Sequence, residues 1–305
     1  MPGPRTLAAD PGSVTTLLRA ALPAVPGLNL LPGVRKAPAE GFGGLTWDRP
    51  GAVVERAHVE QYAAVCGFPR RDVVPVTYPH MLAFPLHMAV MSDPAFPWAA
   101  LGMVHVENTI TAHRDVAVGE RLDVRVSVGA ARPHDKGVLL DFDTTVRAAG
   151  EPVWESRSTY LRRGSTVDGV PAPGLVIPHQ PTGGTQWRLP ADLGRTYAGV
   201  SGDANPIHLY PLTARALGFR RQIAHGMWTL ARSVAAIENR LPEAVTVEAV
   251  FRKPVFLPST VAYAARRDDD TWTFALTNPQ DDSPHLVGRA VPAGAAGAAG
   301  SAGGA

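Results

Sequence analysis

Asp203 and His208 place a carboxylate and an imidazole five residues apart. Between them Pro206 blocks a continuous helix and biases Asn205 toward extended backbone, so both groups sit on a stiff turn. Because an imidazole titrates near neutral pH, such a pair is suited to general acid–base catalysis. The structural alternative is that Asp203 caps the turn and His208 is a hydrogen-bonded polar residue.

The residues that follow predict how the pair is held. Asn205 is a typical N-cap and Pro206 a typical first helical residue, so we expect His208 in the first turn of a short helix. Pro211 interrupts that turn, and a second short helix is expected to run toward Leu217 before Gly218 ends it.

A second stretch, His225-Gly226-Met227, stands where a long apolar helix is expected to begin. The start of such a helix offers unpaired N–H groups and the positive end of the helix dipole. Glycine allows a carbonyl oxygen to approach closely, as an oxyanion hole requires. Close helix packing is the alternative explanation for Gly226. Together with the acid–base pair, this stretch indicates proton chemistry beside a carbonyl.

Other candidates for chemistry carry weaker signals. Ser201 and Ser233 lack a nucleophile context, and Cys66 is most simply a small buried residue. The four histidines of the first half are spread over more than one predicted element, so we expect no metal site: His80, His87, His105 and His113. Four basic residues are candidates to bind carrier phosphates, or are solvated surface: Arg220, Arg221, Arg252 and Lys253. A glycine-rich phosphate loop is absent from the sequence.

Composition limits the class of protein. The chain has 305 residues, 45% of them hydrophobic, which is enough for one large or two ordinary domains. Its net charge is +2 with scattered basic residues, which argues against a nucleic-acid partner. The single cysteine fits a reducing compartment, so we expect a cytoplasmic protein. The sequence predicts neither a signal peptide nor a membrane span.

The pattern along the first half changes from helical to alternating. Residues 14–22 and 52–66 are expected to be helical, and 75–91 a buried helical or mixed segment. From residue 104 the apolar period is two, which predicts an antiparallel sheet with strands at 105–112, 121–128, 138–146 and 153–161.

The second half follows the same plan. Helices are expected at 190–200 and 227–241, and strands at 245–256, 260–267, 272–277 and 285–291. The sequence Tyr62-Ala-Ala-Val-Cys-Gly67 matches Tyr197-Ala-Gly-Val-Ser-Gly202 at an offset of 135, and a weaker match follows at an offset of 139. We infer a duplicated unit. A direct offset places Asp203 on Phe68 and His208 on Val73, so the first copy lacks the ionisable pair.

These patterns divide the chain into five parts. We expect an N-terminal extension (1–45), a first unit (46–163), a linker (164–187), a second unit that carries the chemistry (188–291) and a disordered Gly/Ala tail (292–305).

The stretch from Tyr197 to His208, followed by Ile223-Ala-His-Gly-Met227, resembles the signature of MaoC-like (R)-specific enoyl-thioester hydratases. From about residue 50 to 291 the chain is similar to bacterial double-hot-dog 3-hydroxyacyl-thioester dehydratases. In the first half this similarity includes Val76-Thr-Tyr-Pro79 and His105-Val-Glu-Asn108. The resemblance implies an α+β double hot-dog fold: two tandem units, each a long helix wrapped by an antiparallel sheet.

The resemblance also implies an activity, which is reversible hydration of trans-2-enoyl thioesters to (3R)-hydroxyacyl thioesters of coenzyme A or acyl carrier protein, without a cofactor. Asp203 and His208 would hold the water and transfer the proton, and the N–H of Gly226 would polarise the thioester carbonyl. Residues 81–90 would line an acyl tunnel. The residues expected to contact the substrate are Ser201, Asn205, Tyr210, His225, Arg252 and Lys253.

The sequence departs from the family pattern at Tyr210, Gln222 and Val234, which bears on substrate preference. A non-catalytic thioester-binding subunit and a hot-dog thioesterase remain the alternative functions. Both a monomer and a homodimer are compatible with a double unit.

Overall fold

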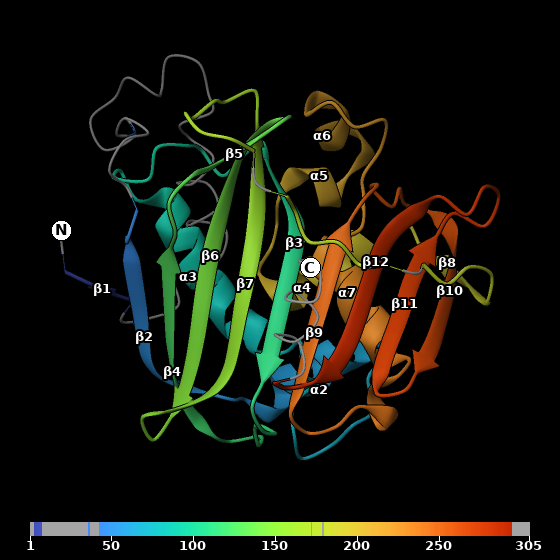
Figure 1. The fold of residues 1–305 in the computed structure, drawn as a ribbon, viewed down its shortest axis with the longest axis horizontal. Helices are drawn as coiled ribbons and strands as arrows, with labels where there is room; N and C mark the ends of the chain where they lie inside the picture. Colours follow the sequence, from blue (N-terminus) through green and yellow to red (C-terminus); the bar gives the residue numbers. More distant parts are fainter. Residues whose placement is uncertain (1–2, 8–35, 37–42, 172, 179, 295–305) are drawn as a thin grey trace, which may run out of the picture.

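Two helices, α3 (Pro79–Ser92) and α7 (Gly226–Ala235), lie against the inner face of one strongly curved, twelve-stranded sheet in the computed structural model (Figure 1). The structure describes residues 3–7, 36, 43–171, 173–178 and 180–294. The helix expected at 14–22 lies outside these residues, as does most of the C-terminal tail. Among the described residues, no helix has the length and apolar character needed to cross a membrane.

The first half of the chain forms one wrapped helix. Its central helix is α3 (Pro79–Ser92), and its other elements are β2 (Thr46–Val53), α2 (Arg56–Cys66), β3 (Met103–Ala112), β4 (Arg121–Val128), β5 (Arg132–His134), β6 (Gly137–Ala148) and β7 (Glu151–Arg163). A short strand, β1 (Arg5–Thr6), pairs in parallel with β2. Helix α3 is apolar on every side and 11 of its 14 residues are buried, as expected of a helix enclosed by a sheet.

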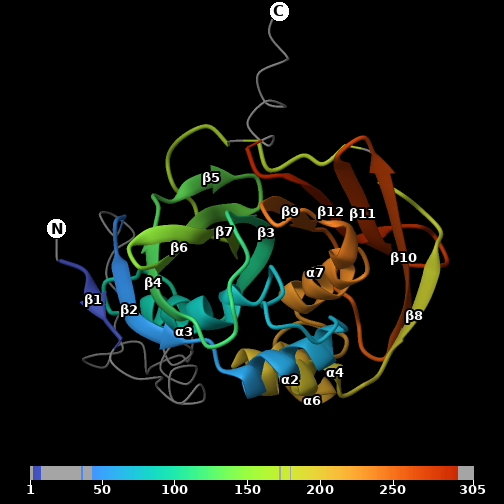
Figure 2. The ribbon, with the colours of Figure 1, turned by 90° about the horizontal axis from the view of Figure 1, so that it is seen from below.

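The second half repeats this arrangement around α7. Its elements are β8 (Thr185–Leu189), α4 (Leu193–Ser201), α5 (Pro206–Leu209), α6 (Pro211–Ala216), α7 (Gly226–Ala235), a 3₁₀-helix (Glu238–Arg240), β9 (Val245–Phe251), β10 (Ser259–Asp268), β11 (Thr271–Thr277) and β12 (Pro284–Pro292). Seen from below, α3 and α7 each lie within the curve of their own strands, and α2 lies beside α4 (Figure 2).

The strand order makes the duplication visible. It is β1-β2-β4-β6-β7-β3-β9-β12-β11-β10-β8, so the halves meet where β3 pairs with β9 antiparallel, from Glu107 opposite Val250 to Ala112 opposite Val245. Outward from this seam, β7, β6, β4 and β2 correspond to β12, β11, β10 and β8. The repeated Tyr62 and Tyr197 are both buried, with ring centroids 6.4 Å apart. The expected α+β double hot-dog fold is therefore confirmed.

Several predicted boundaries were wrong. The helix expected from residue 52 starts at Arg56, because residues 46–53 form β2 despite Pro50 and Gly51. A register shift between Arg49 and Ala52 accommodates these two residues, as is common on outer strands.

In the second half, β8 takes up part of the expected linker, and the helix expected from 190 starts at Leu193. The helix expected over 227–241 ends at Ala235 and tightens into the 3₁₀-helix, a common way for a helix to end. The strand expected over 245–256 ends at Phe251, ahead of Pro254.

Candidate active site

The segment after α4 fixes Asp203 through short-range hydrogen bonds. Gly202 ends the helix in the left-handed region, with φ of 71°. The Asp203 N–H donates to Ser201 Oγ at 3.1 Å, and Asp203 Oδ1 accepts the Asn205 N–H at 3.1 Å. Asn205 Oδ1 in turn accepts the Ile207 N–H at 3.3 Å and caps α5, with Pro206 as its first residue. The predicted capped turn is confirmed.

His208 is held in one orientation and one tautomer. It lies in the single turn of α5, is 7% exposed, and its Nδ1 lies 2.8 Å from the carbonyl oxygen of Ile223. Because that oxygen only accepts, Nδ1 carries the proton in the neutral ring. Nε2 is then free of a proton and can accept one.

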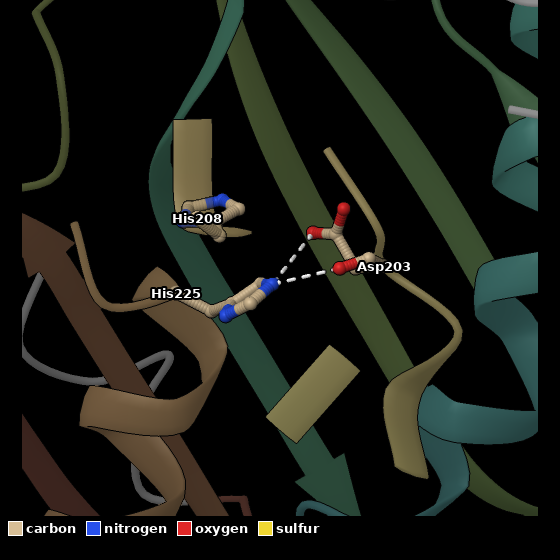
Figure 3. Close-up of side chains that lie close together, drawn as sticks. All are labelled: Asp203, His208 and His225. Carbon is tan, nitrogen blue, oxygen red and sulfur yellow. Dashed lines mark hydrogen bonds and ion pairs between the residues drawn. The ribbon is translucent and has the colours of Figure 1, made fainter. Parts of the chain in front are cut away.

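His225 joins the pair and completes a group of three (Figure 3). Its ring stacks on that of His208 with centroids 3.7 Å apart. Its Nε2 lies 2.9 Å from the Asp203 backbone oxygen and 3.8 Å from Asp203 Oδ2. The ligand-type atoms of Asp203, His208 and His225 all lie within 4.8 Å of one another. One water molecule can bridge two groups at such a separation.

The same three side chains are the ligand types that a divalent metal ion prefers. Their atoms are close enough together for all three to bind one such ion, and equally for two of them to share a water molecule.

Burial keeps both imidazoles neutral. It lowers the pKa of His208, and the nearby Asp203 carboxylate and the Ile223 carbonyl oppose that shift. Burial also holds the pKa of His225 well below its usual range, and the neighbouring His208 adds to this effect. At neutral pH the bare Nε2 of His208 is consequently available as a base.

Gly226 is the first residue of α7 and lines the same cavity. The N–H groups of a first helical turn have no partner within the helix. A Cβ on Gly226 would lie 3.3 Å from ring carbons of Phe251, which is closer than ordinary packing. Glycine therefore leaves room for a ligand atom beside an available N–H.

A cavity of about 830 Å³ extends from these groups into the first half of the chain. Its far wall is one face of α3, formed by Met81, Phe84, Met88 and Met91. With Met103 and Met227, every methionine after Met1 lines this cavity. Methionine side chains are flexible and apolar, so the wall suits a hydrocarbon chain.

The rim of the cavity is basic. Four exposed residues of its lining carry positive charge: Arg163, Arg220, Arg252 and Lys253. Arg220 also lies over the ring of Phe256, with its Cζ 4.1 Å from the ring centroid. A charged rim of this kind can receive phosphate groups of a ligand whose apolar part lies inside.

The structure brings most of the predicted site residues to this cavity, namely Ser201, Asp203, Asn205, His208, His225, Gly226, Arg252 and Lys253. Tyr210 is not part of its lining; it is 52% exposed and packs under Arg195. The cavity lining also contains His80 and His105, which were not among the predicted site residues. The available signal for His80 was its place at the start of the other long apolar helix, as His225 precedes α7.

Comparisons with known proteins converge on one class. A family model for the MaoC-like domain matches residues 179–278. The chain is 38% identical over 283 residues to 3-hydroxyacyl-thioester dehydratase X of Mycobacterium tuberculosis, covering 91% of this chain and 97% of that protein. The crystal structure of the M. tuberculosis protein HtdX matches at 35% identity with a TM-score of 0.73, covering 81% of this chain and 99% of that one.

A plant protein matches a smaller part of the chain. Peroxisomal enoyl-CoA hydratase 2 of Arabidopsis thaliana is 26% identical over 160 residues, which cover 47% of this chain and 52% of that protein.

Proposed function

Because this chain belongs to the MaoC-like family of 3-hydroxyacyl-thioester dehydratases, we propose that it interconverts trans-2-enoyl thioesters and (3R)-hydroxyacyl thioesters by adding or removing water. The observation that carries the proposal is that a carboxylate oxygen of Asp203 and a ring nitrogen of His208 lie within 4.8 Å of each other, in a cavity that also contains the first turn of α7.

In the hydration direction, a water molecule bound between Asp203 and His208 is the nucleophile. Its oxygen attacks C3 of the substrate while His208 Nε2 takes one of its protons, and the same proton is returned to C2. The Asp203 carboxylate holds the water and stabilises the imidazolium that forms. Dehydration follows the same path in reverse. Asn205 and Ser201 hold Asp203 in place rather than touching the reacting atoms.

As the water adds, negative charge develops on the thioester oxygen. The N–H of Gly226, at the positive end of α7, donates to that oxygen. The close ring of Phe251 keeps this position narrow, so that an additional Cβ would crowd the bound carbonyl.

The two units have different roles in the proposed reaction. Residues 188–291 supply the reacting groups, and residues 46–163 supply the wall for the acyl chain along α3. At the positions that a direct offset relates to Asp203 and His208, the first unit has Phe68 and Val73. The carrier enters at the basic rim, where Arg252 and Lys253 lie beside Arg220 and bind phosphate groups of coenzyme A or of the acyl carrier protein arm.

The test follows the ultraviolet absorbance of the enoyl thioester after adding the protein to crotonyl-CoA and to trans-2-decenoyl-CoA. We expect the band to decay to a hydration equilibrium and the (3R)-hydroxyacyl product to regenerate it, with no thiol released. Release of free thiol would instead indicate a thioesterase. Binding without decay of the band would indicate a non-catalytic subunit.

A further inference from the structure

The first unit contributes a polar patch to a wall that is otherwise apolar. His80 in the first turn of α3, His105 on β3 and Tyr160 on β7 all line the cavity. The ring centroids of His105 and Tyr160 are 4.7 Å apart, and those of His80 and His105 are 6.4 Å apart. Neither histidine belongs to the acid–base group of the second unit.

Both histidines retain unused hydrogen-bonding capacity. Within the described part of the chain, His80 Nδ1 and His105 Nε2 are buried and have no hydrogen-bond partner. His80 is 3% exposed. Their neighbour His87 differs, since its ring nitrogens lie 3.2 Å from Tyr160 Oη and from Thr144 Oγ1. Buried polar groups without partners are costly, so two on one cavity wall point to a ligand that supplies the partners.

The charge state of the patch restricts the chemical type of group that can bind there. Burial lowers the pKa of His80 to about 4, with Asp203 opposing, and that of His105 to about 3, so both rings are neutral at neutral pH. Each neutral imidazole has one nitrogen that donates and one that accepts. The ligand group that fits two such rings is one that can both donate and accept a hydrogen bond.

The patch lies near the reacting atoms. The ring of His105 is 5.0 Å from the ring of Phe251, centroid to centroid, and Phe251 packs against Gly226. The charge of Asp203 also reaches His80. A register shift in β3 between His105 and Glu107 occurs at the point where pairing with β9 begins. Bulges of this kind commonly redirect a side chain beside an active site.

Building on the proposed function, we propose that His80 and His105 form a polar subsite that binds a hydroxyl group on the acyl chain, a few carbons beyond the reacting double bond. A hydroxyl group can donate to His105 Nε2 or accept from it, and it can also exchange a hydrogen bond with His80. A keto group at the same position only accepts, so it cannot pair with a ring nitrogen that lacks a proton. The favoured substrates are thus enoyl thioesters that already carry a hydroxyl group.

The experiment compares substrates of one chain length. The probes are trans-2-decenoyl-CoA, its analogues with one hydroxyl at C5, C6 or C7, and the matching ketones. We expect at least one hydroxylated probe to have a kcat/KM about 5- to 10-fold above that of the parent, and the matching ketone to lack this advantage. Equal kcat/KM values for all hydroxylated probes and the parent would overturn the proposal.

Substitutions test whether the preference for a hydroxylated substrate comes from His80 and His105. His105→Phe and His80→Leu should each reduce the ratio of the two kcat/KM values toward one, whereas His113→Phe, at an exposed position of the same unit, should leave it unchanged. A preference that survives both patch substitutions would contradict the assignment. Should neither variant fold, the hydroxyl-against-ketone comparison in the unaltered protein still decides. Failure to hydrate even the parent compound would overturn the proposed function itself.

Discussion

The two imidazoles of the acid–base group differ in what their nitrogens do. His208 donates from Nδ1 to a fixed backbone carbonyl, which leaves Nε2 as an acceptor. His225 instead directs Nε2 at Asp203 and stacks on His208. The first arrangement suits a base, because the ring keeps one orientation while its other nitrogen takes up a proton. The second suits a residue that positions Asp203.

This difference predicts the pH dependence of the reaction. His208 must be neutral to accept a proton, and burial lowers its pKa below the ordinary value of 6.5. We therefore expect kcat/KM for hydration to stay constant as the pH falls from 8 to 6.5 and to decline only below pH 6.5. The measurement is a pH–rate profile of the free enzyme, with circular dichroism at each pH as the control for folding. An acid limb centred at or above pH 6.5 would contradict the assignment.

At the scale of elements, local sequence signals specified the turn that carries the acid–base pair. Asn205 and Pro206 predicted α5 because capping and proline geometry act over a few residues. Strand β4 matches its predicted range, 121–128, because its apolar residues alternate strictly. Strands β2 and β8 could not be predicted from their own residues, since pairing with distant strands, β4 and β10, is what makes them strands.

Prediction of the site from the sequence was limited in the same way, by contacts between distant parts of the chain. The neighbours in sequence, from Ser201 to His208, could be placed from the sequence alone. His80 and His105 could not, because what brings them to the cavity is the packing of the first unit against the second across the β3–β9 seam. The segment between α4 and α7 contains α5 and α6, which have no counterpart between α2 and α3. A constant sequence offset ignores this insertion and therefore did not align His80 with His225.

The start of α7 provides an element-scale prediction. Gly226→Pro removes one N–H at a first helical position, where proline is tolerated, whereas Gly226→Ala adds a similar Cβ and keeps the N–H. We expect the proline variant to lower kcat about 10²- to 10³-fold relative to the alanine variant, as the loss of an oxyanion donor does. Steady-state kinetics with trans-2-decenoyl-CoA measure the ratio, and thermal unfolding of both variants is the control. Equal kcat values would exclude the Gly226 N–H as a donor.

On the scale of the whole molecule, the two units form one continuous sheet and one shared cavity. Helix α2 of the first unit also contacts the second unit through hydrogen bonds. Trp228 Nε1 donates to the carbonyl oxygen of Val65 at 3.0 Å, and His58 Nε2 lies 2.7 Å from the carbonyl oxygen of Val200. The second unit alone would lack the α3 wall. A duplication that kept chemistry in one copy could thus use the other copy to set substrate length.

Substitution at Met88 tests this division of work, because its side chain lines the cavity from the third turn of α3. Met88→Phe should shorten the space for the acyl chain and lower kcat/KM for trans-2-decenoyl-CoA about 10-fold or more. Crotonyl-CoA, whose acyl chain we expect to end before Met88, should be affected much less. Met88→Leu is the matched control, since it retains the volume approximately. Equal losses for the two substrates would show that the chain does not follow α3.

In the proposed mechanism, Asp203 and His208 act on the same water molecule. The most direct measurement is a double-mutant cycle on kcat/KM for hydration with Asp203→Asn, His208→Ala and the double variant, each checked for folding. Groups that act as one unit are strongly non-additive. We predict that each single substitution lowers kcat/KM about 10²- to 10⁴-fold, and that the double variant loses little more than the worse single one. Losses that multiply in the double variant would contradict the account.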